Sequence, residues 1–332
     1  MSAIAVLGAG SYGTALAIQL ARLGNDTRLW GRDAAHMRTL ESDRVNAEYL
    51  PGCKFPPSLR AVADLRAAVQ GADDVLLAVP SHALHPVLRT VAPMLVPGQG
   101  IASAVKGLEP ETGKLVHEVV QDMVGRARRM AVISGPTFAK EVGLGMPTAV
   151  TVASADPEYA EKIVHALHGN GFRAYTSDDV IGVEVGGSVK NVLAIAVGIA
   201  DGLGLGANTR AGVITRGLAE IMRLGEAMGG RRETFMGLAG LGDLVLTCTD
   251  DQSRNRRFGL ALAKGKSVQK ALADIRQMVE GVRAAPEVLR LARKHGVDMP
   301  ISEQVVRVLA GEITPIDAVR NLATRPPRAE TG

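Results

Sequence analysis

The sequence predicts an α/β protein in which a mostly parallel sheet, covered by helices, is followed by an all-helical part. Two observations lead to this fold class. In the first half of the chain, short β-branched runs alternate with helical stretches, as in a parallel sheet with crossover helices. From about Asp179 onward, alanine, leucine and glycine dominate, apolar residues recur at helical spacing and strand-like runs become scarce. We therefore predict two domains, at residues 1–178 and 179–332.

The predicted strands are short runs rich in β-branched and other apolar residues. They are residues 4–7, 27–30, 75–79, 100–104, 130–134, 149–152 and 173–175. Three helices matter for function, and their apolar spacing predicts them at residues 14–23, 180–199 and 254–263.

Composition excludes several classes of protein. A chain of 332 residues with 46% hydrophobic residues can bury a core without disulfides. Its 3% aromatic content and small basic surplus, 38 Lys and Arg against 34 Asp and Glu, give no sign of a nucleic-acid partner. Cys53 and Cys248 lie far apart, which fits a reducing compartment. The apolar runs at 3–7 and 192–200 are too short for a signal peptide or a bilayer span, so we expect a cytoplasmic protein without a membrane partner.

A glycine motif lies between the first predicted strand and the first predicted helix. It comprises Gly8, Ala9, Gly10, Ser11, Tyr12 and Gly13. In this setting the first glycine makes a tight turn, the second lets a pyrophosphate approach, and the third allows close helix packing. The helix N-terminus then offers free N–H groups to phosphate. The motif predicts a Rossmann-type dinucleotide site; the alternative is a glycine-rich turn that binds nothing.

The end of the second predicted strand bears on the choice of coenzyme. In NAD-binding proteins an acidic residue normally holds the ribose at this point. Here Arg32 comes first and Asp33 follows, so an arginine fork could hold the 2′-phosphate of NADPH. We favour NADPH as the cofactor, with NADH as the alternative. Arg32 could also be an ordinary solvated surface arginine.

Four further segments, taken with the glycine motif, identify a family. They are residues 103–107 (SAVKG), 135–141 (GPTFAKE), 184–191 (EVGGSVKN), and 240–243 (GLGD) followed by 253–256 (SRNR). In this order and spacing they closely resemble the bacterial NAD(P)-dependent glycerol-3-phosphate dehydrogenases, from residue 4 to about residue 322. The resemblance implies reversible reduction of dihydroxyacetone phosphate to sn-glycerol 3-phosphate for glycerophospholipid synthesis, by a cytoplasmic homodimer.

Hydride delivery to a ketone creates an alkoxide, which needs a proton donor and a positive field. Lys190 and Lys106 can supply both, and two neighbouring ammonium groups are expected to hold their protons less firmly. The resemblance implies that Lys190 is the catalytic acid/base, oriented by Asn191, and that Lys106 contacts substrate and cofactor. It also implies that Asp243 contacts substrate hydroxyls or holds Lys190. The alternative for Asp243 is a helix-start aspartate.

Two glycines precede Lys190 inside a predicted helix. Each interior glycine costs about 1 kcal/mol relative to alanine, so the backbone at Gly186 and Gly187 must approach something closely. That neighbour could be substrate or nicotinamide against the helix surface. It could equally be another protein segment packed tightly on the helix.

Ser253, Arg254 and Asn255 open a predicted helix, with Ser253 as its cap. Free N–H groups, an arginine fork and an amide suit a phosphate, and the resemblance implies that these positions bind glycerol phosphate. The alternative is a capped surface helix that binds nothing. The resemblance also implies substrate contacts at Gly135 and Thr137. It implies cofactor contacts at Ala139, Arg254, Val279 and Glu280.

Other chemistries find less support. The histidine pairs His82/His85 and His165/His168 lack a third ligand nearby in sequence, so we expect no metal site. A β-hydroxyacid or 6-phosphogluconate type of dehydrogenase would share the domain plan and a Lys-Asn pair, but the Arg254 cradle argues against a simple hydroxyacid. A non-catalytic NAD(P) sensor would have no need for two lysines and Asp243 together.

Overall fold

The computed structural model describes residues 2–110, 112–275, 277–327 and 329–330. Its first half contains an eight-stranded sheet in the order β3-β2-β1-β4-β5-β6-β7-β8. Neighbouring strands are parallel except for the antiparallel pair β6 and β7. The strands are β1 (Ala3–Leu7), β2 (Asp26–Trp30), β3 (Leu59–Val62), β4 (Asp74–Leu77), β5 (Gly100–Ser103), β6 (Met130–Ser134), β7 (Thr148–Ala153) and β8 (Phe172–Ser177).

The seven predicted strands are confirmed, each with ends within two residues of the observed ones. β3 was missed. It is a four-residue edge strand that follows two prolines, and Leu59 is its one fully buried residue. Because only one of its residues is fully buried, β3 lacks the alternation of apolar and polar residues that predicts a strand, and the sequence did not distinguish it from a loop.

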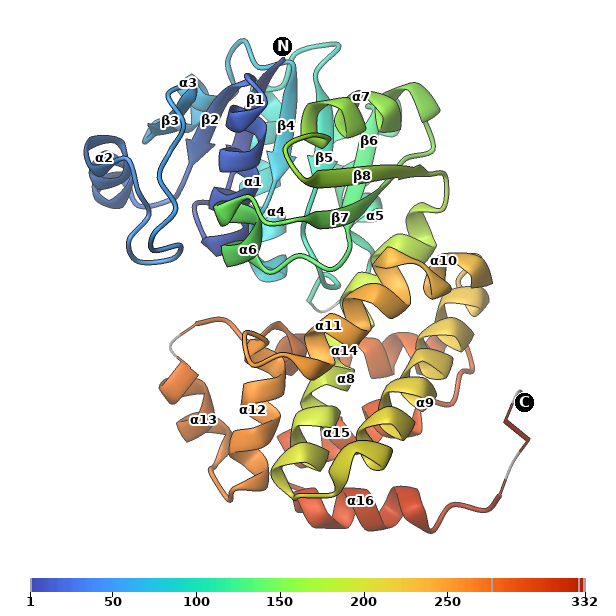
Figure 1. Ribbon diagram of the computed structural model, residues 1–332. Helices are drawn as coiled ribbons and strands as arrows, with labels where there is room; N and C mark the ends of the chain where they lie inside the picture. Colours follow the sequence, from blue (N-terminus) through green and yellow to red (C-terminus); the bar gives the residue numbers. More distant parts are fainter. Residues whose placement is uncertain (1, 111, 276, 328, 331–332) are drawn as a thin grey trace.

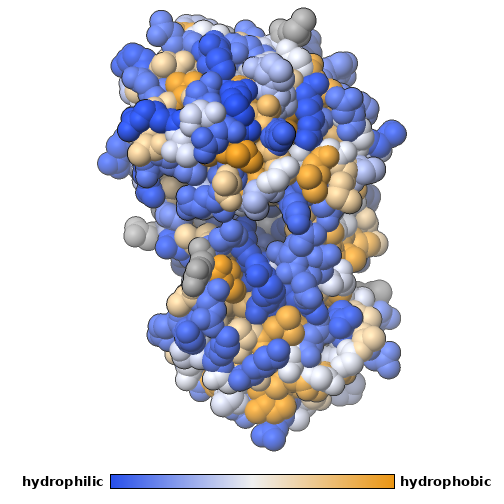
Figure 2. All heavy atoms as spheres, turned by 60° about the vertical axis from the view of Figure 1, so that its left-hand side comes forward, coloured by the Kyte–Doolittle hydropathy of each residue, from blue (hydrophilic) through white to orange (hydrophobic). Residues whose placement is uncertain are grey.

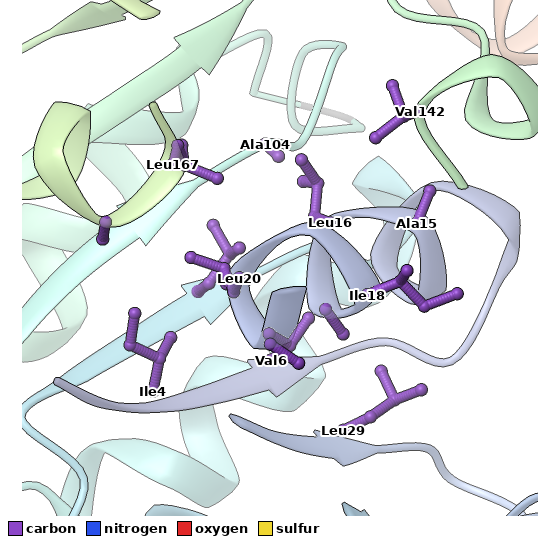
Figure 3. Packing of buried hydrophobic residues seen from close by; sticks show 14 of the residues in the cluster. Ile4, Val6, Ala15, Leu16, Ile18, Leu20, Leu29, Ala104, Val142 and Leu167 are labelled. Carbon is purple, nitrogen blue, oxygen red and sulfur yellow. The ribbon is translucent and has the colours of Figure 1, made fainter. Parts of the chain in front are cut away.

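Both faces of the sheet are buried, as expected for parallel strands between helices. Ile4 and Val6 of β1 pack on one face with Leu16 and Leu20 of α1 (Figure 3). The alternate residues of β1 pack on the opposite face, under α4 and α5. The helical segments of this half are α1 (Ser11–Arg22), α2 (Ala34–Asp43), α3 (Leu65–Val69), α4 (Ser81–Val91), η1 (Ala92–Met94), α5 (Val116–Val124), α6 (Ala139–Leu144) and α7 (Pro157–Leu167).

The second half consists of helices joined by turns and loops, with no strand among its described residues, and lies beside one end of the sheet (Figure 1). α8 runs through its centre, and its apolar side chains form the core with those of the surrounding helices. The predicted change of texture near Asp179 thus coincides with the end of the sheet at Ser177. The helical segments are α8 (Val180–Gly202), α9 (Gly206–Ala227), α10 (Arg232–Met236), η2 (Leu238–Gly242), α11 (Asp243–Thr249), α12 (Arg254–Ala263), α13 (Val268–Ile275), α14 (Glu280–Lys294), α15 (Pro300–Leu309) and α16 (Pro315–Ala323).

α8 confirms the helix predicted at 180–199 and continues to Gly202, so it extends well beyond the apolar run at 192–200. In the described part of the chain it is the one helix that is long and apolar enough to cross a bilayer, but 83% of its most apolar window is buried inside the protein. Its start is anchored by Asp179, which accepts hydrogen bonds from the backbone N–H of Gly182 and Arg231, at 2.8 Å each. α8 is therefore the central core helix, and it carries Lys190 and Asn191.

Candidate active site

The glycine motif has the geometry that a dinucleotide site needs. Gly8 has φ of +125°, and a Cβ there would lie 2.5 Å from the Ala78 carbonyl oxygen. A Cβ on Gly13 would lie 1.9 Å from the Gly8 oxygen, so close packing requires this glycine. At Gly10 a Cβ would meet nothing within 4 Å. The open space lies directly before Ser11, where α1 begins without a side-chain cap, so first-turn N–H groups are available to a pyrophosphate.

At the end of β2, Arg32 and Asp33 differ in what they can reach. The Asp33 carboxylate caps α2, accepting from the N–H of Ala35 at 2.8 Å and of His36 at 3.0 Å. Arg32 is exposed. Burial, followed by the charges of Arg283 and Arg32, lowers the pKa of His82 at the start of α4. Arg32 and Arg283 therefore place positive charge near the end of β2. The carboxylate of Asp33, by contrast, is used to cap α2.

A buried carboxylate joins the two predicted catalytic lysines. Asp243, which is 1% exposed, forms an ion pair through Oδ1 with the Lys190 ammonium and lies 2.8 Å through Oδ2 from the Lys106 ammonium. Lys190 also donates to the Thr247 hydroxyl at 3.1 Å. Asp243 is the first residue of α11, as the alternative of a helix-start aspartate expected, and its carboxylate also contacts both lysines.

The two lysines differ in acidity. Burial lowers the pKa of Lys190 to about 8; the Lys106 charge acts in the same direction and Asp243 opposes it. The pKa of Lys106 is raised, because Asp243 and Tyr12 outweigh the effect of its own burial. The expectation that both ammonium groups hold their protons less firmly is thus wrong for Lys106. The reason is the carboxylate that the two lysines share.

Lys106 is held by groups that follow β6 and by Tyr12. Its ammonium donates to the Gly135 carbonyl at 2.9 Å and to the Thr137 hydroxyl at 3.4 Å. Thr137 Oγ1 also lies 3.1 Å from the hydroxyl of Tyr12, whose ring centroid is 5.5 Å from the ammonium. The structure therefore brings Tyr12, Gly135 and Thr137 to Lys106. Ala139, by contrast, packs against the apolar core around α1.

Gly186 and Gly187 are explained by packing within the protein. A Cβ on Gly186 would lie 2.5 Å from the Ala239 carbonyl oxygen in η2. A Cβ on Gly187 would lie 2.7 Å from the Ser134 hydroxyl at the end of β6. Of the two alternatives, a bound ligand or other protein segments, the structure therefore favours the protein segments. Their effect on the site is indirect, because this packing brings α8 against the residues that precede Asp243.

α12 begins as predicted, with Ser253 as its cap: the serine hydroxyl accepts from the N–H of Arg256 at 3.2 Å. Asn255 is buried, and its amide is engaged by the protein. It donates to Asn191 Oδ1 at 3.0 Å and accepts from the Gly281 N–H at 2.9 Å.

Arg254 faces the start of α14. Burial lowers its pKa, and the charge of Glu280 opposes that effect. Glu280 in turn accepts from the Ser81 hydroxyl at 3.3 Å, which connects α14 to the first turn of α4. Val279, the residue before α14, is buried. The predicted residues of the helical half thus gather around α8, α12 and α14.

Sequence reasoning missed Thr247 and Ser81. Thr247 lies four residues after Asp243, on the same face of α11, and its hydroxyl donates to the Asp243 carbonyl at 2.6 Å. Ser81 lies just after β4, at the end of the sheet where ligands of open α/β folds bind. Both positions could have been noticed from spacing once Asp243 and the sheet order were known.

The cluster of Lys106, Lys190 and Asp243 combines both halves of the chain. Lys106 follows β5 and Thr137 follows β6, whereas Lys190 and Asp243 come from α8 and α11. Figure 2 shows the surface hollowed between the two lobes, with hydrophilic side chains around the hollow. Within the described residues, no three His, Cys, Asp or Glu side chains lie close enough to hold a metal ion. Cys53 and Cys248 are both buried and unpaired.

Comparisons with known proteins agree with this arrangement. The family model for the NAD-dependent glycerol-3-phosphate dehydrogenase N-terminus matches residues 3–160, and the model for the C-terminus of the same family matches residues 179–320. A glycerol-3-phosphate dehydrogenase [NAD(P)+] of Stenotrophomonas maltophilia is 54% identical over 98% of this chain and 96% of its own length. One from Aeromonas salmonicida is 55% identical over 99% and 98%. The crystal structure of glycerol-3-phosphate dehydrogenase from Coxiella burnetii has a TM-score of 0.94 and 49% identity, covering 98% of this chain and 99% of that one.

Proposed function

Because the chain belongs to the NAD-dependent glycerol-3-phosphate dehydrogenase family, we propose that it reversibly reduces dihydroxyacetone phosphate to sn-glycerol 3-phosphate, with Lys190 as the general acid/base. It is an NAD(P)-dependent oxidoreductase. The observation that carries the proposal is the buried Lys190–Asp243–Lys106 cluster, in which one lysine is more acidic than the other.

The chemistry that a bound reduced nicotinamide supplies is the hydride. As the substrate carbonyl is reduced, its oxygen gains negative charge, and Lys190 donates a proton to it. With a pKa of about 8, Lys190 can both hold and release that proton near neutral pH. Lys106 keeps its charge and stabilises the developing alkoxide in a buried site, where such a charge acts strongly. Asp243 holds both ammonium groups in place.

The substrate phosphate is assigned to the start of α12. Ser253 and Arg254 lie at a helix N-terminus, where N–H groups and a guanidinium favour an anion, and Asn255 adds one amide N–H. Gly135 and Thr137 complete the substrate side beside Lys106. Anchoring a phosphate that does not react positions the carbonyl for hydride transfer.

The cofactor is assigned to the glycine motif and the groups that face it. Gly10 leaves the space that a pyrophosphate requires, and Arg32 is available to a 2′-phosphate because Asp33 caps α2. We assign NADPH as the preferred cofactor, with NADH as the alternative. The remaining residues assigned to the cofactor are Gly8, Ser11, Tyr12, Gly13, Lys106, Ala139, Arg254, Val279 and Glu280.

The test of the proposed reaction is an NADPH oxidation assay with product identification. Dihydroxyacetone phosphate is supplied beside a panel of 2- and 3-keto acids, and the product is analysed with a stereospecific method. We expect one sn-glycerol 3-phosphate for each NADPH consumed and little turnover of the keto acids. Faster oxidation with a keto acid would assign the chain a hydroxyacid activity instead.

The coenzyme assignment is tested at Arg32. Arg32→Ala is expected to weaken NADPH binding much more than NADH binding, because the guanidinium contacts the group that only NADPH carries. Dissociation constants for both coenzymes, measured by nucleotide fluorescence, provide the comparison. Equal losses for the two coenzymes would remove the 2′-phosphate role.

Three further assignments accompany the proposed reaction. Residues 1–178 form the dinucleotide-binding domain and residues 179–332 the substrate-binding domain. The enzyme acts in the cytoplasm as a homodimer and supplies glycerophospholipid synthesis. Light scattering of the purified protein tests the dimer, and a glycerol requirement of a strain lacking the enzyme tests the role in lipid synthesis.

A further inference from the structure

α14 carries Glu280 and Gly281 in its first turn but does not cap itself. Val279 precedes the helix and makes no capping hydrogen bond with its side chain. The N–H of Gly281 donates instead to Oδ1 of Asn255, at 2.9 Å. Since Asn255 belongs to α12, one first-turn N–H of α14 is satisfied by a side chain from another helix.

The same amide also reaches the catalytic helix. Asn255 Nδ2 donates to Asn191 Oδ1 at 3.0 Å, and Asn191 is the neighbour of Lys190 on α8. Asn255 and Asn191 are 8% and 6% exposed, so the bond between them is shielded from water. One buried amide thus connects α8, α12 and α14 at the residues that face the site.

The three helices have little room to move where this amide connects them. A Cβ on Gly281 would lie 2.5 Å from the Asn191 carbonyl oxygen. A Cβ on Gly259 would lie 2.2 Å from the Ile195 carbonyl oxygen, so α12 and α8 cross backbone to backbone. Arg256 of α12 donates to Asp201 of α8 at 2.7 Å. Asn255 is therefore held in place from both sides.

We propose that Asn255 is a positioning residue that caps α14 in trans and thereby sets Val279 and Glu280 relative to Lys190. The inference rests on the proposed function, in which Val279 and Glu280 contact the cofactor. It assigns Asn255 a role in cofactor binding that is independent of substrate. An amide has two N–H donors, and within the described residues one of them has no protein partner, which leaves it for the substrate phosphate.

The experiment measures NADPH dissociation constants without substrate, so it separates the trans-cap from a phosphate contact. Loss of a helix cap typically costs about 1 kcal/mol, so Asn255→Ala is expected to raise the NADPH dissociation constant about five- to tenfold. Asn255→Asp keeps the acceptor for the Gly281 N–H but loses the donor to Asn191 Oδ1, so it is expected to weaken NADPH binding less than Asn255→Ala does. If Asn255→Ala leaves NADPH binding unchanged, or if Asn255→Asp is as weak as Asn255→Ala, the proposal is overturned.

A matched control comes from α15, which is also capped in trans. Glu220 of α9 accepts from the N–H of Ile301 at 2.5 Å and from the Ser302 hydroxyl at 2.8 Å. Glu220→Ala removes this cap, as Asn255→Ala removes the cap of α14, and is expected to lower the melting temperature with no change in NADPH binding. Equal weakening of NADPH in both variants would mean general destabilisation and would contradict the proposal. Wild-type protein that binds NADPH but does not reduce dihydroxyacetone phosphate would contradict the proposed function alone.

Discussion

Asp243 determines how the two lysines differ. Its carboxylate contacts both ammonium groups, and it raises the pKa of each. For Lys106 this effect prevails over burial, whereas for Lys190 burial and the second ammonium prevail, which leaves its pKa at about 8. Two chemically identical side chains thus differ in acidity, as the proposed roles of a lasting cation for Lys106 and a proton donor for Lys190 require.

The proposed role of Lys190 as proton donor can be tested by substitution. Lys190→Ala is expected to bind NADPH normally but to lose turnover by about 10²- to 10⁴-fold, the usual contribution of a general acid. Steady-state kcat and NADPH dissociation constants provide the two readouts. A kcat close to that of wild type would exclude Lys190 from the proton transfer.

The acidity of Lys190 predicts the pH dependence. Reduction needs the protonated ammonium, so kcat/KM for dihydroxyacetone phosphate should fall as pH rises through about 8, while oxidation of glycerol 3-phosphate should rise over the same range. Asp243→Asn removes the charge that raises the pKa of Lys190, so this pKa should fall. The remaining reductase activity of the variant should therefore decline at a lower pH than that of wild type. An unchanged pH midpoint in Asp243→Asn would contradict this account.

Two arginines of the helix α12 lie in different surroundings: Arg254 near the candidate site and Arg257 in solvent. Arg254 lies beside Glu280, whereas Arg257 is exposed three residues later. Arg254→Ala is expected to raise KM for dihydroxyacetone phosphate and to lower kcat, because the phosphate anchor also positions the carbonyl. Arg257→Ala serves as the control and should change neither constant by more than about twofold. A rise in KM with an unaltered kcat would mean that Arg254 binds the ground state and the transition state equally well and does not position the carbonyl.

Helix packing explains why glycine is required at one helical position and not at another. A Cβ on Gly186 would lie 2.5 Å from a backbone oxygen, whereas one on Gly212 in α9 would meet nothing within 4 Å. Gly186→Ala should destabilise the protein by about 1–3 kcal/mol through overpacking. Gly212→Ala should instead stabilise it by about 0.5–1 kcal/mol. Thermal unfolding of the two variants tests the pair; a stabilised Gly186→Ala would contradict the packing described here.

For the whole molecule, the sequence was enough to predict seven of the eight strands in the described residues and the helical second half, but it missed β3, Thr247 and Ser81. The features that it predicted depend on residues that are close together in the sequence, such as glycines between a strand and a helix or a serine cap before an arginine. The sequence did not reveal that Asp243 serves both lysines, because Lys106 lies 137 residues away and the contact depends on how the two halves meet. The same holds for Asn255, whose partners come from two other helices.

The proposed function requires that the two halves form one site that reduces a phosphorylated ketone. The most direct test compares kcat/KM for dihydroxyacetone phosphate with that for dihydroxyacetone, which has the same carbonyl but no phosphate, in wild type and in Arg254→Ala. We expect a large preference for the phosphate ester in wild type, and a much smaller one in Arg254→Ala. Equal reduction of both ketones by the wild-type enzyme would contradict it.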